Sequence, residues 1–462
     1  MIDIVLATCL ISFYDIKFVD ELPLVNDPIR QQSSGWERVN THARRVRTLY
    51  MEPLSVVISP NIYLRIGAMY DTPFLPGLNK IYIPNNASLD LSSALFLASG
   101  STFNLVQIDG NAISDRQFFV PFLSSLYVKS PGLTHLTLRG VNASLEPIHR
   151  FAKLQSLDLR LRGPHLYPQL LQKLGQLRHL LDLIIDTGGY GDVVTSVHTN
   201  PISSNPKFRQ LRQLHFIGNA TSISRILDEM KGIANLTTLK IDESGAGNST
   251  GSSWRSSFEA ISTFSALEDI EITHTLNRSF GQYILSVHFL APLFRLDNMK
   301  SFVINSNNAV SSGSDYDFSR FADAFPKLKK FAVPGITFFD LKRTLACLYH
   351  FSRKCPELRE IRIGLSPNSI SDNLNAIKGL PHPIVRNLRH PLEKLYIDCD
   401  FGQELQLTQS LRVARFLDLI FPNLCTLETD NRKLTEASNW AGIHELRLAL
   451  WDARTNSSSC DI

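Results

Sequence analysis

Histidine and cysteine are the side chains of this sequence that could bind a metal ion or act as a nucleophile. The chain has 13 histidines and 6 cysteines in its 462 residues. His382 and His390 flank a proline-containing loop, but two ligands fall short of the three or four protein ligands of a zinc site. Cys399 and Cys425 lie in or beside predicted strands, where small buried residues are expected. We therefore predict no catalytic residue, no metal site and no cofactor.

Motifs of the common catalytic classes are absent as well. The sequence holds no G-x-x-x-x-G-K-[ST], G-x-G-x-x-G, G-x-S-x-G or H-E-x-x-H. The cysteines form no C-x-x-C pair and do not have the density of a disulfide framework, so a reducing compartment is expected. The chain is accordingly predicted not to be an enzyme and to be cytoplasmic or nuclear.

Sequons of the form N-x-[ST] raise the alternative of a glycosylated protein. They begin at Asn86, Asn142, Asn219, Asn235, Asn248, Asn277 and Asn456. Two of them, Asn86 and Asn219, fall on a repeat position that is expected to face inward, where a glycan could not fit. Since Asn, Ser and Thr are frequent in this chain, several sequons arise by chance, and we interpret the set as incidental.

Composition and charge exclude two further classes. The chain is 44% hydrophobic and 19% charged, with a net charge of +4 and no long basic run, so nucleic acid is not indicated. No stretch of 18 or more apolar residues could span a membrane. Residues 3–13 form an apolar run that could be a signal-peptide core, but Asp3 stands where a basic segment is expected. A buried helix or strand is the favoured interpretation.

The elements that position the side chains follow from a repeat. An apolar triplet of the form L-x-x-L-x-L recurs with a mean spacing of about 28 residues, which is typical of the longer leucine-rich repeats. Its fifteen copies begin at Val46, Leu78, Phe103, Leu133, Leu154, Leu180, Leu211, Leu236, Leu267, Met299, Leu328, Leu358, Leu392, Leu424 and Ile443. The second and third apolar positions lie two residues apart, so they share one face of a short strand.

Helices are predicted ahead of the strands. Leu341, Leu345, Leu348 and Phe351 have the spacing of one helix face, as do Leu411, Ala414, Leu417 and Ile420. A proline two residues before the triplet ends several helices: Pro131, Pro326, Pro356 and Pro422. Polar segments at 187–207, 243–257, 305–317 and 366–391 are predicted to be loops.

The predicted fold is therefore α/β: an irregular leucine-rich-repeat solenoid with parallel strands on a concave face and helices on the convex face. The solenoid is expected to span residues 46–451, after an N-terminal cap or F-box remnant at 1–45 and before a flexible tail at 452–462. In the turn after the strand, Asn86, Asn111, Asn219 and Asn307 occupy the ninth repeat position, where an amide can satisfy backbone groups.

The outward-facing residues of the strands are the candidate binding site. They point away from the helices and line one surface of stacked parallel strands. The predicted protein-binding residues are His135, Thr137, Arg139, Asp158, Arg160, His215, Lys240, Glu271, Arg362 and Tyr396. The expected partner is a protein target, bound by a monomer.

The start of the repeat array resembles the large fungal family of F-box proteins with leucine-rich-repeat-like regions. The resemblance rests on Trp36-Glu-Arg-Val39, on the segment from Ala43 through Arg-Arg-Val-Arg-Thr to Leu49, and on the irregular repeats that follow. It implies a substrate-recognition subunit of a cullin-type ubiquitin ligase. In this family the F-box holds a Skp-type adaptor and the repeats hold the target.

The F-box itself is expected to be missing from this sequence. The segment Glu21-Leu-Pro-Leu-Val25 is similar to an F-box opening, but Pro28 and the run from Gln31 to Gly35 interrupt the helices that should follow. The chain as given is therefore predicted to bind no Skp-type adaptor, either through a start at an internal methionine or through loss of the module. A secreted or cell-surface leucine-rich-repeat recognition protein is the alternative, favoured by the sequons and the apolar start.

Overall fold

The fold was analysed in a computed structural model of the 462-residue chain. The chain divides into two compact units, Met1–Asp186 with Pro206–Gln210 and Thr187–Asn205 with Leu211–Ile462. The structure describes residues 41–50, 75–83, 103–109, 116–140, 145–160, 168–186, 208–244, 251–275, 283–306, 309–333, 343–365, 370–381, 390–397, 405–429 and 439–458.

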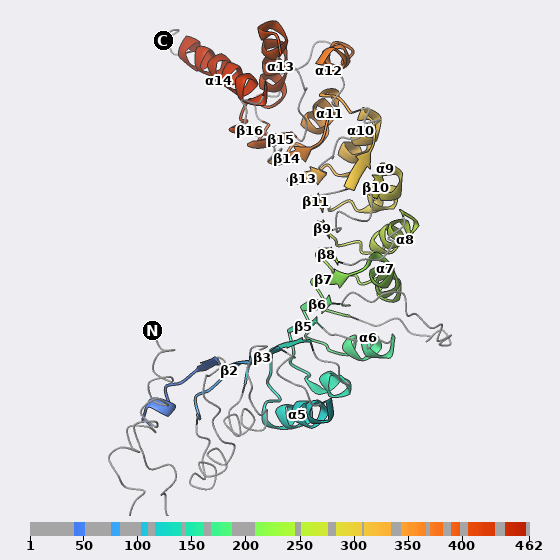
Figure 1. Cartoon of the computed structure of the whole chain (residues 1–462), viewed down its shortest axis with the longest axis vertical. Coiled ribbons are helices and arrows are strands. Elements are labelled where there is room, and N and C mark those ends of the chain that lie inside the picture. Colours follow the sequence, from blue (N-terminus) through green and yellow to red (C-terminus); the bar gives the residue numbers. More distant parts are fainter. Residues whose placement is uncertain are drawn as a thin grey trace, which may run out of the picture. The chain divides into compact units, whose positions relative to one another are not determined.

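The first unit is a run of parallel strands that pair in chain order. These strands are β1 (Thr48–Tyr50), β2 (Lys80–Ile83), β3 (Leu105–Asp109), β4 (His135–Arg139), β5 (Ser156–Arg160) and β6 (Asp182–Asp186). Between them lie α5 (Arg116–Lys129), the 3-10 helix η3 (Glu146–Arg150) and α6 (Pro168–Leu174). Figure 1 shows α5 and α6 on one side of these strands.

The second unit repeats the pattern over a longer run. Its parallel strands are β7 (Gln213–Gly218), β8 (Thr238–Ser244), β9 (Asp269–Thr275), β11 (Ser301–Ser306), β13 (Lys330–Val333), β14 (Glu360–Ile363), β15 (Lys394–Ile397) and β16 (Thr426–Glu428). A separate parallel pair joins β10 (Tyr283–Ser286) and β12 (Ala309–Ser312).

Helices of the second unit cover one face of its strands (Figure 1). They are α7 (Ala220–Glu229), α8 (Gly251–Ile261), α9 (Val287–Leu290), η5 (Ala291–Arg295), α10 (Asp315–Ala324), α11 (Ala346–Lys354), α12 (Ile370–Lys378), α13 (Leu407–Ile420) and α14 (Asn439–Ser458). In neither unit does the strand order close on itself. The predicted class is confirmed: the chain is α/β, with parallel strands that alternate with helices in an open, leucine-rich-repeat-like solenoid.

The triplets form the core between strands and helices. Leu136, Leu157 and Leu183 are paired in register on β4, β5 and β6, and each is at most 1% exposed. Fourteen of the fifteen triplets coincide with a strand of this kind. The stacking of one unit on the next buries a continuous apolar layer, which is why the repeat is stable only as an array.

The proline positions behave as predicted, because proline cannot continue a helix. Helix α5 ends at Lys129 before Pro131, and α13 ends at Ile420 before Pro422. The loop predictions are wrong in part, since segments 243–257, 305–317 and 366–391 contain portions of α8, α10 and α12. In α8, Trp254, Phe258 and Ile261 are buried at helical spacing, and this apolar face outweighs the Ser- and Gly-rich composition.

The fifteenth triplet does not form a strand, and that prediction is wrong. Ile443, Leu446 and Leu448 lie inside α14, which buries Trp440, Ile443 and Arg447 at helical spacing. Leu448 is 41% exposed, unlike the third triplet position of every strand for which the structure describes that residue. Helix α14 continues to Ser458, beyond Asp452, where the flexible tail was expected to begin.

Neighbouring strands in both units share one hydrogen-bond pattern at their starts. The carbonyl of the residue just before one strand accepts hydrogen bonds from two N–H groups at the start of the next strand. The carbonyl of Thr134, for example, accepts hydrogen bonds from the N–H groups of Gln155 and Ser156 at 2.8 and 3.0 Å. The carbonyl of Glu393 does the same for Cys425 and Thr426. At the end of the second unit, α14 packs against β16 instead, and Arg447 of this helix donates to the carbonyl of Leu424. A helix thus takes the place of a further strand at β16.

Candidate functional site

The face of the strands that carries no helices is built from the outward-facing strand residues, which lie between the triplet positions or directly after the third one. We call it the open strand face and describe it separately for each unit. In the first unit it includes a set that we call the terminal row, formed by the last residues of β3, β4, β5 and β6: Asp109, Arg139, Arg160 and Asp186. Their preceding neighbours, Ile108, Leu138, Leu159 and Ile185, are fully buried in the core.

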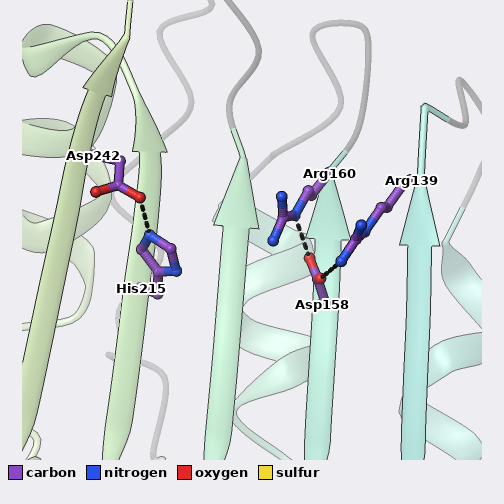
Figure 2. A network of polar contacts seen from close by, with 5 residues as sticks. All are labelled: Arg139, Asp158, Arg160, His215 and Asp242. Atoms are coloured by element: carbon purple, nitrogen blue, oxygen red, sulfur yellow. Dashed lines mark hydrogen bonds and ion pairs between the residues drawn. The ribbon is translucent and has the colours of Figure 1, made fainter. Parts of the chain in front are cut away.

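Asp158 holds the two arginines of the terminal row. Its Oδ2 accepts a hydrogen bond from Nη2 of Arg139 at 3.0 Å, and its Oδ1 accepts one from Nε of Arg160 at 3.1 Å. Figure 2 shows the carboxylate between the two guanidinium groups. Asp158 is only 6% exposed, whereas each arginine side chain is 34% exposed. Because like charges at opposed positions of neighbouring strands repel, the shared carboxylate is what permits this pair of arginines.

His135 lies at the other end of β4 on the same face. It is exposed, and its Nδ1 is 2.8 Å from the hydroxyl of Thr134. Asp182 occupies the same register position two strands away, and burial raises the pKa of its carboxyl while His135 partly opposes the rise. Thr137 lies between His135 and Arg139 and is half-buried. The sequence-predicted residues of this unit are thus brought together on two adjacent strands.

The open strand face of the second unit begins with a polar network on β7, β8 and β9. Nε2 of His215 lies 2.7 Å from Oδ2 of Asp242 on the neighbouring strand (Figure 2). Lys240 and Glu271 form an ion pair at 3.6 Å. Nδ2 of Asn305 donates to Oε1 of Glu271 at 3.3 Å, which extends the network to β11.

Arg362 and Tyr396 lie apart from this network. The register places them in the same row as Glu271, but Val303 and Ala332 stand between. Val303 is 7% exposed and Ala332 is 3% exposed, so the polar residues of this row fall into two groups. The structure therefore does not bring Arg362 and Tyr396 together with His215, Lys240 and Glu271.

Four polar residues of the open strand faces were not predicted from the sequence: Asp109, Asp186, Asp242 and Asn305. Asp109 and Asp186 follow the third triplet position directly, as Arg139 and Arg160 do. That shared position was the available signal. This signal could not be used from the sequence alone. Only the pairing of the strands shows that Asp109 and Asp186 lie in one row with the two arginines.

The candidate metal and thiol residues have structural roles or lie outside the described residues. His390 is 1% exposed; its Nε2 donates to the carbonyl of Cys355 at 3.1 Å and its Nδ1 accepts from the N–H of Leu392 at 3.2 Å. His382 and Cys399 are outside the described residues. Cys425 is exposed, which corrects the expectation of a buried residue, because its position precedes the triplet strand rather than facing the core. No metal-binding group of His, Cys, Asp and Glu occurs in the part of the chain that the structure describes.

A polar cluster between α10 and α11 lies beside a fully buried thiol. Asp315 accepts hydrogen bonds from the N–H and the hydroxyl of Thr344 at 2.7 and 2.6 Å. The guanidinium of Arg343 lies over the ring of Phe318, 4.9 Å from its centroid. Burial, with a contribution from Asp315, raises the pKa of the Cys347 thiol well above its ordinary value. Cys347 is therefore a neutral, buried thiol of α11, and it is not suited to act as a nucleophile.

The sequons are placed only in part. Oδ1 of Asn219 accepts from the N–H of Ser222 at 2.8 Å and caps α7, as predicted for the ninth repeat position. Asn235 is exposed and Asn456 lies within α14. The sequons at Asn86, Asn142, Asn248 and Asn277, and the ninth-position residues Asn111 and Asn307, are outside the described residues.

No family model matches the sequence, and no curated protein matches it. One solved structure that matches is the crystal structure of a protein from Bacteroides fragilis, determined by a structural genomics consortium. It is 15% identical, covers 60% of this chain and 72% of that chain, and has a TM-score of 0.30. None of the described helices is both long and apolar enough to cross a membrane.

Proposed function

We propose that this chain is a repeat scaffold that binds a protein target through its open strand faces and catalyses no reaction itself. The observation that carries the proposal is the arrangement of polar side chains in register on these faces. Asp158 fixes two arginines in the first unit, and Glu271 links Lys240 and Asn305 in the second. Side chains that are already held in place lose little conformational freedom on binding, which favours recognition.

A second, more specific proposal concerns the cellular process, ubiquitin transfer, in which the scaffold takes part. The residues from Trp36 to Leu49 resemble the fungal F-box family, so the target is proposed to be a substrate of a cullin-type ubiquitin ligase, with this chain or a longer relative as its recognition subunit. Such a subunit would act in the cytoplasm or nucleus. The Skp-type adaptor would contact an F-box, and residues 1–40 are outside the described residues.

Affinity capture followed by a direct binding measurement tests the scaffold proposal. The full chain serves as bait, beside a variant with Thr137→Arg and Lys240→Glu on the open strand faces. A control carries Arg225→Glu on α7, which is an exposed position of the helix layer. Each captured protein is then purified and titrated against all three baits. We expect at least a tenfold loss for the face variant and no change for the control. Equal binding by all three would contradict the proposal.

Reconstitution tests the ligase role separately. The full chain is co-expressed with a Skp-type adaptor and a cullin, and ubiquitin transfer to the captured target is measured. Transfer that depends on the chain supports the role. If the adaptor does not co-purify while the target still binds, this chain is a scaffold that needs a separately supplied F-box. If neither adaptor nor target binds, both proposals fail.

A further inference from the structure

The terminal row of the first unit carries an ordered pattern of charge. Asp109 is paired in register with Arg139, Arg139 with Arg160, and Arg160 with Asp186. The order across the four strands is therefore acidic, basic, basic, acidic. Neighbouring strands lie about 4.8 Å apart, so the row extends over roughly 14 Å.

The two arginines at the centre are held in position before any partner arrives. Asp158 occupies one nitrogen of each, Nη2 of Arg139 and Nε of Arg160, and it is almost fully buried. A guanidinium has five N–H donors, so each arginine can still donate to a carboxylate of a partner. The side chains are one-third exposed, which leaves room for that contact.

The two ends of the row have the opposite preference. Asp109 and Asp186 are half-buried carboxylates at the ends of β3 and β6. They would repel a uniformly acidic partner, and with Asp158 they outnumber the two arginines. A simple anion is therefore a poor match to the row as a whole, whereas a segment with acidic side chains between basic ones complements all four positions.

We propose that the terminal row of the first unit binds a protein segment in which one or two acidic side chains lie between two basic side chains. This inference rests on the proposed function as a protein-binding scaffold and names the chemistry of the bound segment. The central acidic groups bind Arg139 and Arg160, and the flanking basic groups bind Asp109 and Asp186. Asp158 acts as a positioning residue that does not touch the segment.

Synthetic peptides test the charge order directly. The probes are peptides of Gly, Ala and Ser that carry four charges in the order basic, acidic, acidic, basic, with zero to three small residues between neighbouring charges. Matched sets carry the reversed order, four acidic residues, or one basic end and one acidic end. Binding to the labelled full chain is measured at constant ionic strength, because exposed ion pairs are screened by salt. We expect the first order to bind about tenfold more tightly than its reverse.

Charge reversal at the ends supplies the decisive variants. Asp109→Lys should change the preference at one peptide end from basic to acidic, and Asp109→Lys with Asp186→Lys should make the uniformly acidic peptide the best ligand. Arg150→Glu, at an exposed position of η3, is the matched control and should leave the order unchanged. Circular dichroism and the thermal midpoint establish that each variant is folded.

Three results would overturn the inference. The first is that the peptides bind equally well whatever their charge order, or bind the wild type and the Asp109→Lys variant with the same affinity. This result would overturn the inference but leave the proposed scaffold function intact. Complete displacement of the peptide by inorganic phosphate would show that the arginines form a simple anion site. If no peptide binds, the inference fails, and the scaffold proposal then depends on the captured intact target alone.

Discussion

His215 on β7 and Asp242 on β8 are joined across two strands by a contact of 2.7 Å between Nε2 and Oδ2. The two side chains are 20% and 33% exposed, so water screens the pair only in part. A double-mutant cycle with His215→Gln and Asp242→Asn should give a coupling free energy of about 1 kcal/mol in urea unfolding.

The pair of Lys240 and Glu271 is the internal comparison for that cycle. It is longer, at 3.6 Å, and more exposed. Its coupling should be smaller than that of His215 and Asp242. Equal coupling free energies, or a larger one for Lys240 and Glu271, would show that His215 and Asp242 do not form the stronger contact.

Core and face positions of the same strand should differ in stability. Leu136, Leu239 and Ile361 are at most 1% exposed. Their replacement by Ala should lower the free energy of unfolding by roughly 2–5 kcal/mol, through lost burial and the cavity that remains. Thr137→Ala and Arg362→Ala, on the open strand face, should cost under about 1 kcal/mol. Urea denaturation of the five variants provides the measurement, and similar values for both sets would refute the assignment of faces.

Acid should weaken the second unit through His390. Burial lowers the pKa of this imidazole from its ordinary 6.5 to about 4. Between these values the unfolded chain takes up a proton that the folded chain does not, so stability is complete above pH 6.5 and is lost as the pH falls toward 4. The loss attributable to His390 over this range is about 3 kcal/mol.

Two histidine variants isolate that effect. His390→Gln has no titrating group at the site, so its unfolding free energy should fall less between pH 7 and pH 4.5 than that of the wild type. His179→Gln, at an exposed position, should keep the wild-type slope. A wild-type slope in the His390→Gln variant would contradict the role of this residue.

Cysteine alkylation should be selective in the native protein. Burial raises the pKa of Cys355 to about 12 and that of Cys347 well above its ordinary value. Both thiols are also inaccessible, whereas Cys425 is exposed. Treatment with iodoacetamide at pH 8, followed by peptide mass mapping, should modify Cys425 while Cys347 and Cys355 react only after denaturation. Native modification of Cys355 at the rate of Cys425 would show that the interior of the second unit opens readily.

The sequence predicted the strands better than the segments between and after them. A triplet such as Leu133, Leu136 and Leu138 predicts a strand and its buried face, because apolar residues two positions apart lie on the same side of a strand. Ile443, Leu446 and Leu448 have the same spacing, yet their segment also places Trp440 and Arg447 on one helix face. The choice between strand and helix there depends on tertiary contacts, since α14 packs against α13 and β16.

On the open strand faces, too, the sequence predicted part of the arrangement, and tertiary structure determined the rest. Arg139, Asp158 and Arg160 could be assigned to the candidate site because each is one residue away from a buried triplet position and so faces the opposite side of the strand. The ion pair between Arg139 and Asp158, and the addition of Asp109 and Asp186 to the same row, depend on strand register, which connects residues 19 to 30 positions apart in the sequence. The exposure of Cys425 likewise depends on its position just before β16, which spacing alone does not show.

The packing of α14 against β16 has a consequence for self-association. An unpaired edge strand is a template on which a second molecule can add its own strand, and growth of that kind leads to filaments. At β16, α14 packs where a further strand would pair, and its Arg447 donates to the carbonyl of Leu424 just before this strand. Loss of this helix would therefore convert the C-terminal end of the second unit into a nucleus for polymerisation.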